Sequence, residues 1–183
     1  IASEPLAKKS FEYQYKIVEN YFFTKNPAEF KSELYSWIKN YNLKSSWGQA
    51  NKSDAAYIEK CKLQQEQTLR SYILQQHQTA QNSRAPYSRQ AADEGYKLYF
   101  LEFGDSAQAG DMHFFYGELL YDLGRFNDAA IEYTAVINGF PNSQYLEKSA
   151  QNALLALEKI LPADEDLQKR TGNSIEPIAL DQK

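Results

Sequence analysis

The sequence predicts an all-helical protein, in which an α-α superhelix, or solenoid, follows a helical N-terminal region. Its 8 glycines and 6 prolines are few, and they fall between stretches of helical spacing. No stretch shows the alternation of apolar and polar residues that marks a half-buried strand. A third observation is an internal repeat at an offset of about 37 residues, a period typical of units that must stack to bury their apolar faces. The matched pairs are Ala92 and Ala129, Tyr96 and Tyr133, Phe100 and Ile137, Phe103 and Phe140, and Ser106 and Ser143.

The first predicted helix spans residues 10–23. Its large apolar side chains recur at the spacing that places them on one helix face, and they are Phe11, Tyr15, Val18 and Phe22. We expect this face to pack against the rest of the protein.

The second predicted helix begins at Asn26, which is followed by Pro27 at the first helical position and Glu29 at the third. Helical spacing then continues through Phe30, Leu34, Trp37 and Tyr41. The polar stretch 42–52, which contains Gly48, is predicted to be a loop. Residues 1–52 therefore form a predicted aromatic-rich helical hairpin.

A long helix is predicted over residues 53–81, with Ser53 as its cap. Its apolar positions are Ala56, Tyr57, Cys61, Leu69, Tyr72 and Ile73. Its many glutamines indicate a solvated helix face more than a functional surface, because Gln is a good uncharged helix former.

Shorter helices are predicted from Pro86 to Pro162. The breaks between them lie near residues 103–110, Gly124 and residues 139–143. Residues 53–162 thus make up the predicted repeat region. Residues 163–183 are polar, contain Gly172 and Pro177, and are predicted to be a tail or a linker.

The clearest repeat unit runs from Phe115 to Pro141. Gly117 and Ala129 are small where two helices would cross closely, and Tyr133 is large enough to fill the space beside them. Gly124 permits the turn between the helices, and Pro141 stops the second one. Together with Phe126, these residues stand at the spacing of the tetratricopeptide repeat (TPR), which this stretch resembles.

The resemblance has two departures. His113 occupies the family's early Trp position, where we expect it to serve as a packing residue, and Val136 occupies its late Ala position. The junction 139–145 resembles a Phe-Pro-Asn-Ser turn found in bacterial envelope members of the superfamily, such as the lipoprotein of the outer-membrane assembly machine and the Tol-Pal coordinator. The resemblance implies a periplasmic or cell-envelope location, and a cytoplasmic one stays open.

Composition disfavours several classes of partner. The net charge of -4 and the absence of a dense Lys/Arg run argue against nucleic acid and against an acidic membrane surface. No run approaches the roughly 20 apolar residues that a membrane-spanning helix needs.

No residue pattern indicates catalysis. His77 and His113 lie in different predicted helices, without a carboxylate or thiol at metal-ligand spacing. Cys61 is predicted to be a small buried residue more than a nucleophile. Phosphate-binding loops and known catalytic motifs are also missing from the sequence. We therefore expect no catalytic residue, no metal site and no cofactor.

The resemblance implies a partner-binding groove lined by the first helix of the clear repeat. The residues that it assigns to this groove are Asp111, Phe114, Glu118, Tyr121 and Asp122. Acids beside aromatic rings favour a basic or neutral protein segment with an apolar anchor. The alternative is that Phe114 and Tyr121 only pack on the preceding helix. If the groove binds, replacing Phe114 and Glu118 should weaken partner capture without changing the thermal melt.

The predicted function is a protein-protein interaction scaffold or adaptor of TPR type in a bacterial cell-envelope assembly, without enzymatic activity. The alternative is an accessory helical domain of a larger envelope-acting enzyme, whose catalytic part would lie outside this chain. A catalytic domain elsewhere in the full reading frame would favour that alternative. The identity of the partner stays open.

Overall fold

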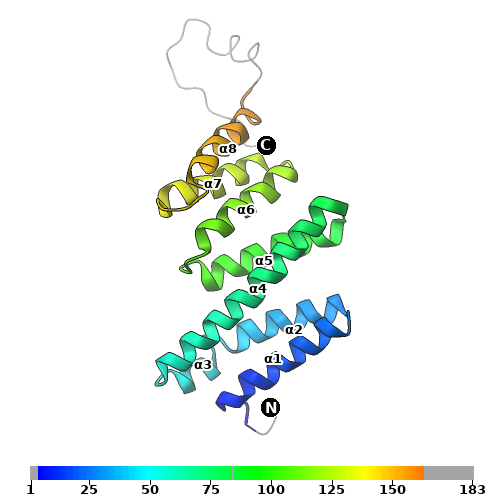
Figure 1. Ribbon diagram of the computed structural model, residues 1–183, viewed down its shortest axis with the longest axis vertical. Coiled ribbons are helices and arrows are strands. Elements are labelled where there is room, and N and C mark those ends of the chain that lie inside the picture. The colour runs from blue at the N-terminus through cyan, green and yellow to red at the C-terminus, as the bar shows by residue number, and fades with distance from the viewer. Residues whose placement is uncertain (1–3, 84, 163–183) are drawn as a thin grey trace, which may run out of the picture. The chain divides into compact units, whose positions relative to one another are not determined.

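The computed structural model describes residues 4–83 and 85–162 (Figure 1). Within these residues the chain forms eight α-helices and no strand, which confirms the predicted all-helical class. The helices belong to two compact units, one reaching Gln78 and the other starting at Thr79. The superhelix and the divisions at residues 52 and 162 stay predictions, and the predicted tail lies outside the described residues.

In the first unit, α1 (Lys8–Phe23) packs against α2 (Pro27–Asn40). Aromatic rings fill the space between them, with the centroid of Phe11 at 5.0 Å from that of Trp37. The cap of α2 is as predicted, because the Asn26 side chain accepts a hydrogen bond from the Glu29 amide. On the predicted face of α1, however, Phe22 is 54% exposed. It lies in the last turn of α1, where the helix borders a hollow.

The predicted loop 42–52 contains a short helix, α3 (Ser46–Asn51), so this prediction was wrong. Ser45 caps α3 by accepting a hydrogen bond from the Gly48 amide. A side chain at Gly48 would collide with the backbone carbonyl of Asn42, and glycine permits that close approach. The Trp47 indole N–H then donates to the Ala7 carbonyl, which ties α3 to the chain before α1.

The long helix α4 spans Ala55–Ser83. Its cap is Asp54 and not the predicted Ser53, because the Asp54 carboxylate accepts a hydrogen bond from the Tyr57 amide at 3.1 Å. One glutamine departs from the predicted solvated face. Gln65 is 1% exposed, and its amide donates to the Trp37 carbonyl at 3.1 Å. A buried amide needs such a partner, so Gln65 joins α4 to the end of α2.

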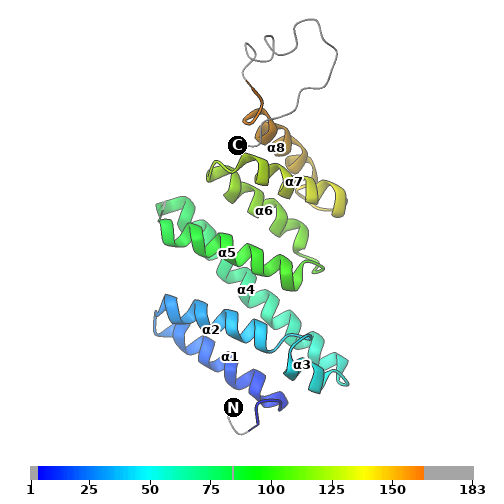
Figure 2. The ribbon, with the colours of Figure 1, turned by 180° about the vertical axis from the view of Figure 1, so that it is seen from behind.

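The second unit contains four shorter helices, which begin and end close to the predicted breaks. They are α5 (Pro86–Phe103), α6 (Ala109–Asp122), α7 (Phe126–Gly139) and α8 (Leu146–Glu158). Neighbours in sequence pack on one another, most extensively α6 on α7 and α7 on α8 (Figures 1 and 2). Gly124 has a φ of +73° in the turn before α7, a conformation that favours glycine.

The internal repeat is visible in the backbone hydrogen bonds of two turns. The Ser106 amide donates to the Phe103 carbonyl at 2.9 Å, and the Ser143 amide donates to the Phe140 carbonyl at the same distance. In the next step, Ala109 donates to Ser106 and Leu146 donates to Ser143, both at 3.1 Å. The turns that precede α6 and α8 therefore close in the same way, about 37 residues apart.

The small and large residues predicted to pack within the repeat meet as expected. The Tyr133 ring lies so close to Gly117 that an added β-carbon would approach the ring to 2.6 Å. Ala129 and Tyr133 are both buried. The second helix, α7, ends at Gly139, two residues before Pro141.

Candidate protein-binding surfaces

The five residues of the predicted groove all lie on α6, but they differ in what they contact. Phe114 is only 7% exposed. Its ring stacks on that of Tyr145, with the centroids 4.3 Å apart and the planes at 3°. The partner ring comes from the segment just before α8, a contact that the packing alternative did not include. Its role in partner binding stays a prediction, while its packing role is visible.

Glu118 is engaged inside the second unit as well. One of its carboxylate oxygens accepts hydrogen bonds from the Tyr133 hydroxyl at 2.5 Å and from the Asn152 amide at 2.7 Å. Burial and the adjacent Glu118 raise the pKa of Tyr133, so the hydroxyl remains the donor. A single carboxylate thus links α6, α7 and α8. Because of these contacts, we no longer expect replacement of Phe114 and Glu118 to leave the thermal melt unchanged.

The other three groove residues reach the surface. Asp111 accepts a hydrogen bond from the exposed Gln144 side chain at 3.2 Å. The Tyr121 ring meets that of Phe126 edge-on at 5.0 Å. Asp122 is exposed and borders a hollow of about 370 Å³ together with Arg89. These three residues could contact a partner without disturbing the core.

His113 packs against aromatic rings, as expected from the sequence. Its ring stacks on Phe100 with a centroid distance of 3.9 Å and an interplanar angle of 13°. Its Nδ1 lies 2.7 Å from a carboxylate oxygen of Glu132. The ring thus fills the space of an aromatic residue while its polar edge meets an acid from α7.

Sequence reasoning missed a polar cluster around Asp93. Its carboxylate accepts hydrogen bonds from Lys97, from the Tyr116 hydroxyl and from the Arg125 guanidinium. Burial raises the pKa of Asp93, but these hydrogen bonds outweigh it and the net pKa is lowered. Only the spacing of Asp93 and Lys97, one helical turn apart, was a signal in the sequence. The cluster joins α5 to α6 and to the turn before α7.

Cys61 is buried, as predicted, with 3% of its surface exposed. Burial chiefly raises its pKa to about 11, so the thiol is protonated at neutral pH. Among the described residues, no group of three or more His, Cys, Asp or Glu side chains is placed to hold a metal ion. No helix in this part of the chain is both long enough and apolar enough to cross a membrane.

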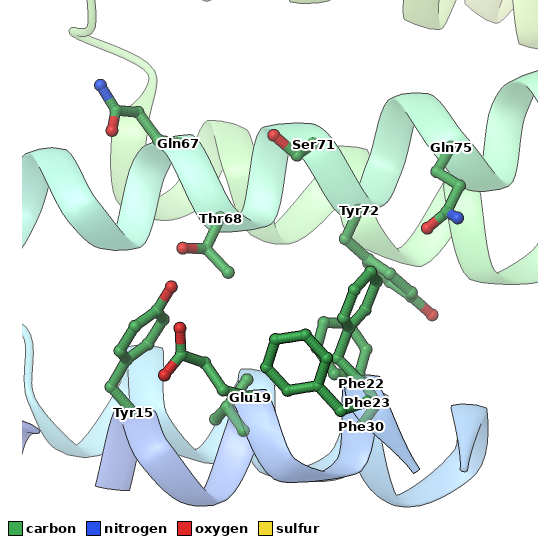
Figure 3. Close-up of a pocket in the computed structure, with 11 residues that line it drawn as sticks. Tyr15, Glu19, Phe22, Phe23, Phe30, Gln67, Thr68, Ser71, Tyr72 and Gln75 are labelled. Carbon is green, nitrogen blue, oxygen red and sulfur yellow. The ribbon is translucent and has the colours of Figure 1, made fainter. Parts of the chain in front are cut away.

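The first unit carries a second candidate surface, which we call the aromatic cleft. It is a hollow of about 580 Å³ between α1, α2 and α4 (Figure 3). Rings from all three helices border it, and Phe22 and Phe23 are 54% and 74% exposed. The residues that line it are Tyr15, Val18, Glu19, Phe22, Phe23, Phe30, Gln67, Thr68, Ser71, Tyr72 and Gln75. The predicted groove was placed on α6 alone, so sequence reasoning missed this surface.

Comparisons with protein-family models, with curated proteins and with solved structures each find no match to this chain.

Proposed function

We propose that this chain is a protein-binding scaffold or adaptor built from TPR-like helix pairs. The observation that carries the proposal is the recurrence of the same turn hydrogen bonds before α6 and before α8. Units that repeat in this way bury their apolar faces against their neighbours and leave extended surfaces for partners. The close approach of Tyr133 to Gly117 adds support. In a TPR-like helix pair, a small residue is expected to face a large one where the two helices cross.

The partner-facing surface is the exposed part of the predicted groove, made by Asp111, Tyr121 and Asp122. Two carboxylates about three helical turns apart on α6, one of them next to the Tyr121 ring in sequence, suit a basic or neutral protein segment with an apolar anchor. Phe114 and Glu118 support this surface from beneath, through the stack on Tyr145 and the hydrogen bond from Tyr133. The resemblance to envelope TPR proteins supports the further proposal that the scaffold works in a bacterial cell-envelope assembly.

The test compares proteins captured from an envelope extract by three forms of the chain. They are the unmodified chain, an Asp111→Lys/Asp122→Lys variant, and a control variant, Glu59→Lys/Glu158→Lys, with the same change in net charge. All four acids lie outside the core, and the control pair lies off α6. Circular dichroism first verifies that each form is folded.

Quantitative mass spectrometry then measures recovery. We expect a defined set of proteins to bind the unmodified chain and the control, and to be reduced at least about tenfold with the Asp111→Lys/Asp122→Lys variant. Equal recovery by all three forms would remove the assignment of the surface on α6. Equal loss in both variants would show that only net charge matters.

A further inference from the structure

The aromatic cleft of the first unit presents a row of four neighbouring rings. Phe23 and Phe22 have centroids 5.8 Å apart, Phe22 and Phe30 5.7 Å, and Phe30 and Tyr72 5.4 Å. A second hollow, of about 490 Å³, borders the same four rings and includes Lys25. The row therefore forms a wall that the two hollows share. The end of α1, the start of α2 and Tyr72 of α4 contribute to it.

Two adjacent phenylalanines exposed at the end of one helix are costly to leave in water. Burying such a side chain against a partner is favourable because it removes apolar surface from water. Buried aromatic side chains are accordingly among the strongest contacts of protein interfaces. The rings of Phe22 and Phe23 meet edge-on, with their planes at 75°, and both side chains line the hollow while more than half of each stays exposed. An apolar side chain inserted there would contact rings on more than one side.

A carboxylate lies in the same cleft. Figure 3 shows Glu19 between Tyr15 and the phenyl rings. Burial and the adjacent Glu19 carboxylate raise the pKa of Tyr15, so the Tyr15 hydroxyl stays protonated beside Glu19. No ion pair within the described part of the chain includes Glu19. A partly buried acid beside aromatic faces favours a cation, because both the charge and the ring faces attract it.

We infer that the aromatic cleft binds a segment of a partner protein that presents a large apolar side chain next to a lysine or arginine. The apolar side chain packs on Phe22, Phe23 and Phe30, and the cation lies over the rings towards Glu19. The inference rests on the proposed protein-binding function, but it concerns a surface separate from α6. The charge disfavours a second copy as the occupant, since a two-fold pairing through this cleft would bring two Glu19 carboxylates into one apolar interface.

The experiment uses three short fluorescein-labelled peptides that share length and flanking Gly-Ser residues. Their central sequences are Leu-Phe-Arg-Leu, Leu-Phe-Glu-Leu and Ser-Ser-Arg-Ser. Fluorescence anisotropy measures their binding to the whole chain. We expect the apolar basic peptide to bind at least about tenfold more tightly than either of the others.

Two variants and one control locate the binding. Phe23→Ser should weaken the apolar basic peptide at least about tenfold, and the exposure of Phe23 leaves the fold intact. Glu19→Gln should erase the preference for the basic over the acidic peptide. Tyr13→Ser serves as the control, because Tyr13 is an exposed ring of α1 that does not line the cleft.

Equal binding of the acidic and basic peptides would overturn the inference, as would an unchanged affinity in Phe23→Ser or no binding up to about 1 mM. Sedimentation that shows dimers of the unmodified chain but monomers of Phe23→Ser would assign the cleft to a second copy and also overturn it. A failure of the proposed function would be distinguishable, because protein capture by the Asp111→Lys/Asp122→Lys variant tests the surface on α6. That variant leaves the aromatic cleft unaltered.

Discussion

The ring of Tyr133 lies directly on the backbone of Gly117, at the crossing of α6 and α7. Replacing Gly117 with alanine would place a β-carbon 2.6 Å from the ring, which must then move. The ring is buried and its hydroxyl is held by Glu118. Overpacking of this kind costs about 1–3 kcal/mol, against a gain of about 1 kcal/mol from alanine's helix propensity. The balance is a loss, and we expect Gly117→Ala to lower the free energy of unfolding by up to about 2 kcal/mol in urea denaturation.

Gly139→Ala is the matched control for that substitution. Gly139 is also helical, but a β-carbon there meets nothing within 4 Å. The same change should therefore leave stability unchanged or raise it by up to about 1 kcal/mol. Equal effects at the two positions would show that the contact between Gly117 and Tyr133 does not limit packing.

Phe114 should contribute to stability whatever it contributes to binding. It is buried and stacked on Tyr145, so Phe114→Ala removes a core ring and should cost about 3–5 kcal/mol. Tyr121→Ala, at a more exposed position of the same helix, should cost clearly less. Thermal and chemical denaturation distinguish the two, and an unaltered melt for Phe114→Ala would contradict the stacking.

The Asp93 cluster should make stability depend on pH. The folded-state pKa of Asp93 is lowered, so its contribution is present above the unfolded-state pKa of about 3.9 and is lost as the pH falls through the folded-state pKa. At pH 7, Asp93→Asn should reduce the free energy of unfolding by about 1.5–3 kcal/mol. The difference from the unmodified chain should shrink below about pH 4.

Asp128→Asn controls for the loss of a carboxylate beside Arg125. Its ion pair with Arg125 is solvent-exposed, so the substitution should cost less than about 1 kcal/mol. Denaturation curves collected between pH 3 and pH 7 compare the two variants. A constant difference for Asp93→Asn across that range would show that the ionised carboxylate is not what stabilises the cluster.

Cys61 should resist thiol reagents in the folded protein. With a pKa raised to about 11, about one thiol in a thousand is ionised at pH 8, and the side chain is also buried. We expect Ellman's reagent to react at least about 100-fold faster in guanidinium chloride than in buffer. Similar rates in the two conditions would mean that the end of α4 that carries Cys61 opens readily.

The sequence was most informative where a pattern is local. The cap at Asn26 and the left-handed Gly124 follow from rules that involve only a few neighbouring residues, and both are present in the structure. The meeting of Gly117 and Tyr133 was predictable because both lie within one helix pair. The short helix α3 was missed although its Ser45 cap is local. The hydrogen bond from the Trp47 indole to the Ala7 carbonyl joins distant positions and could not be predicted from spacing.

The candidate surfaces were harder to predict for the same reason. The resemblance assigned the groove residues to one helix, but it did not indicate that Tyr145 covers Phe114. The aromatic cleft combines Phe22, Phe30 and Tyr72 from three helices. No spacing rule within one helix reveals a hollow that three helices share.

The matching turns before α6 and α8 bear on how such a chain can grow. The turns at Ser106 and Ser143 close with the same hydrogen bonds. A duplicated stretch of about 37 residues would therefore start and end in turns of the same geometry. Lengthening a protein by copying a segment of its gene then requires no new loop to evolve. A longer descendant would gain surface one helix pair at a time, and the exposed residues of each added pair could then change independently.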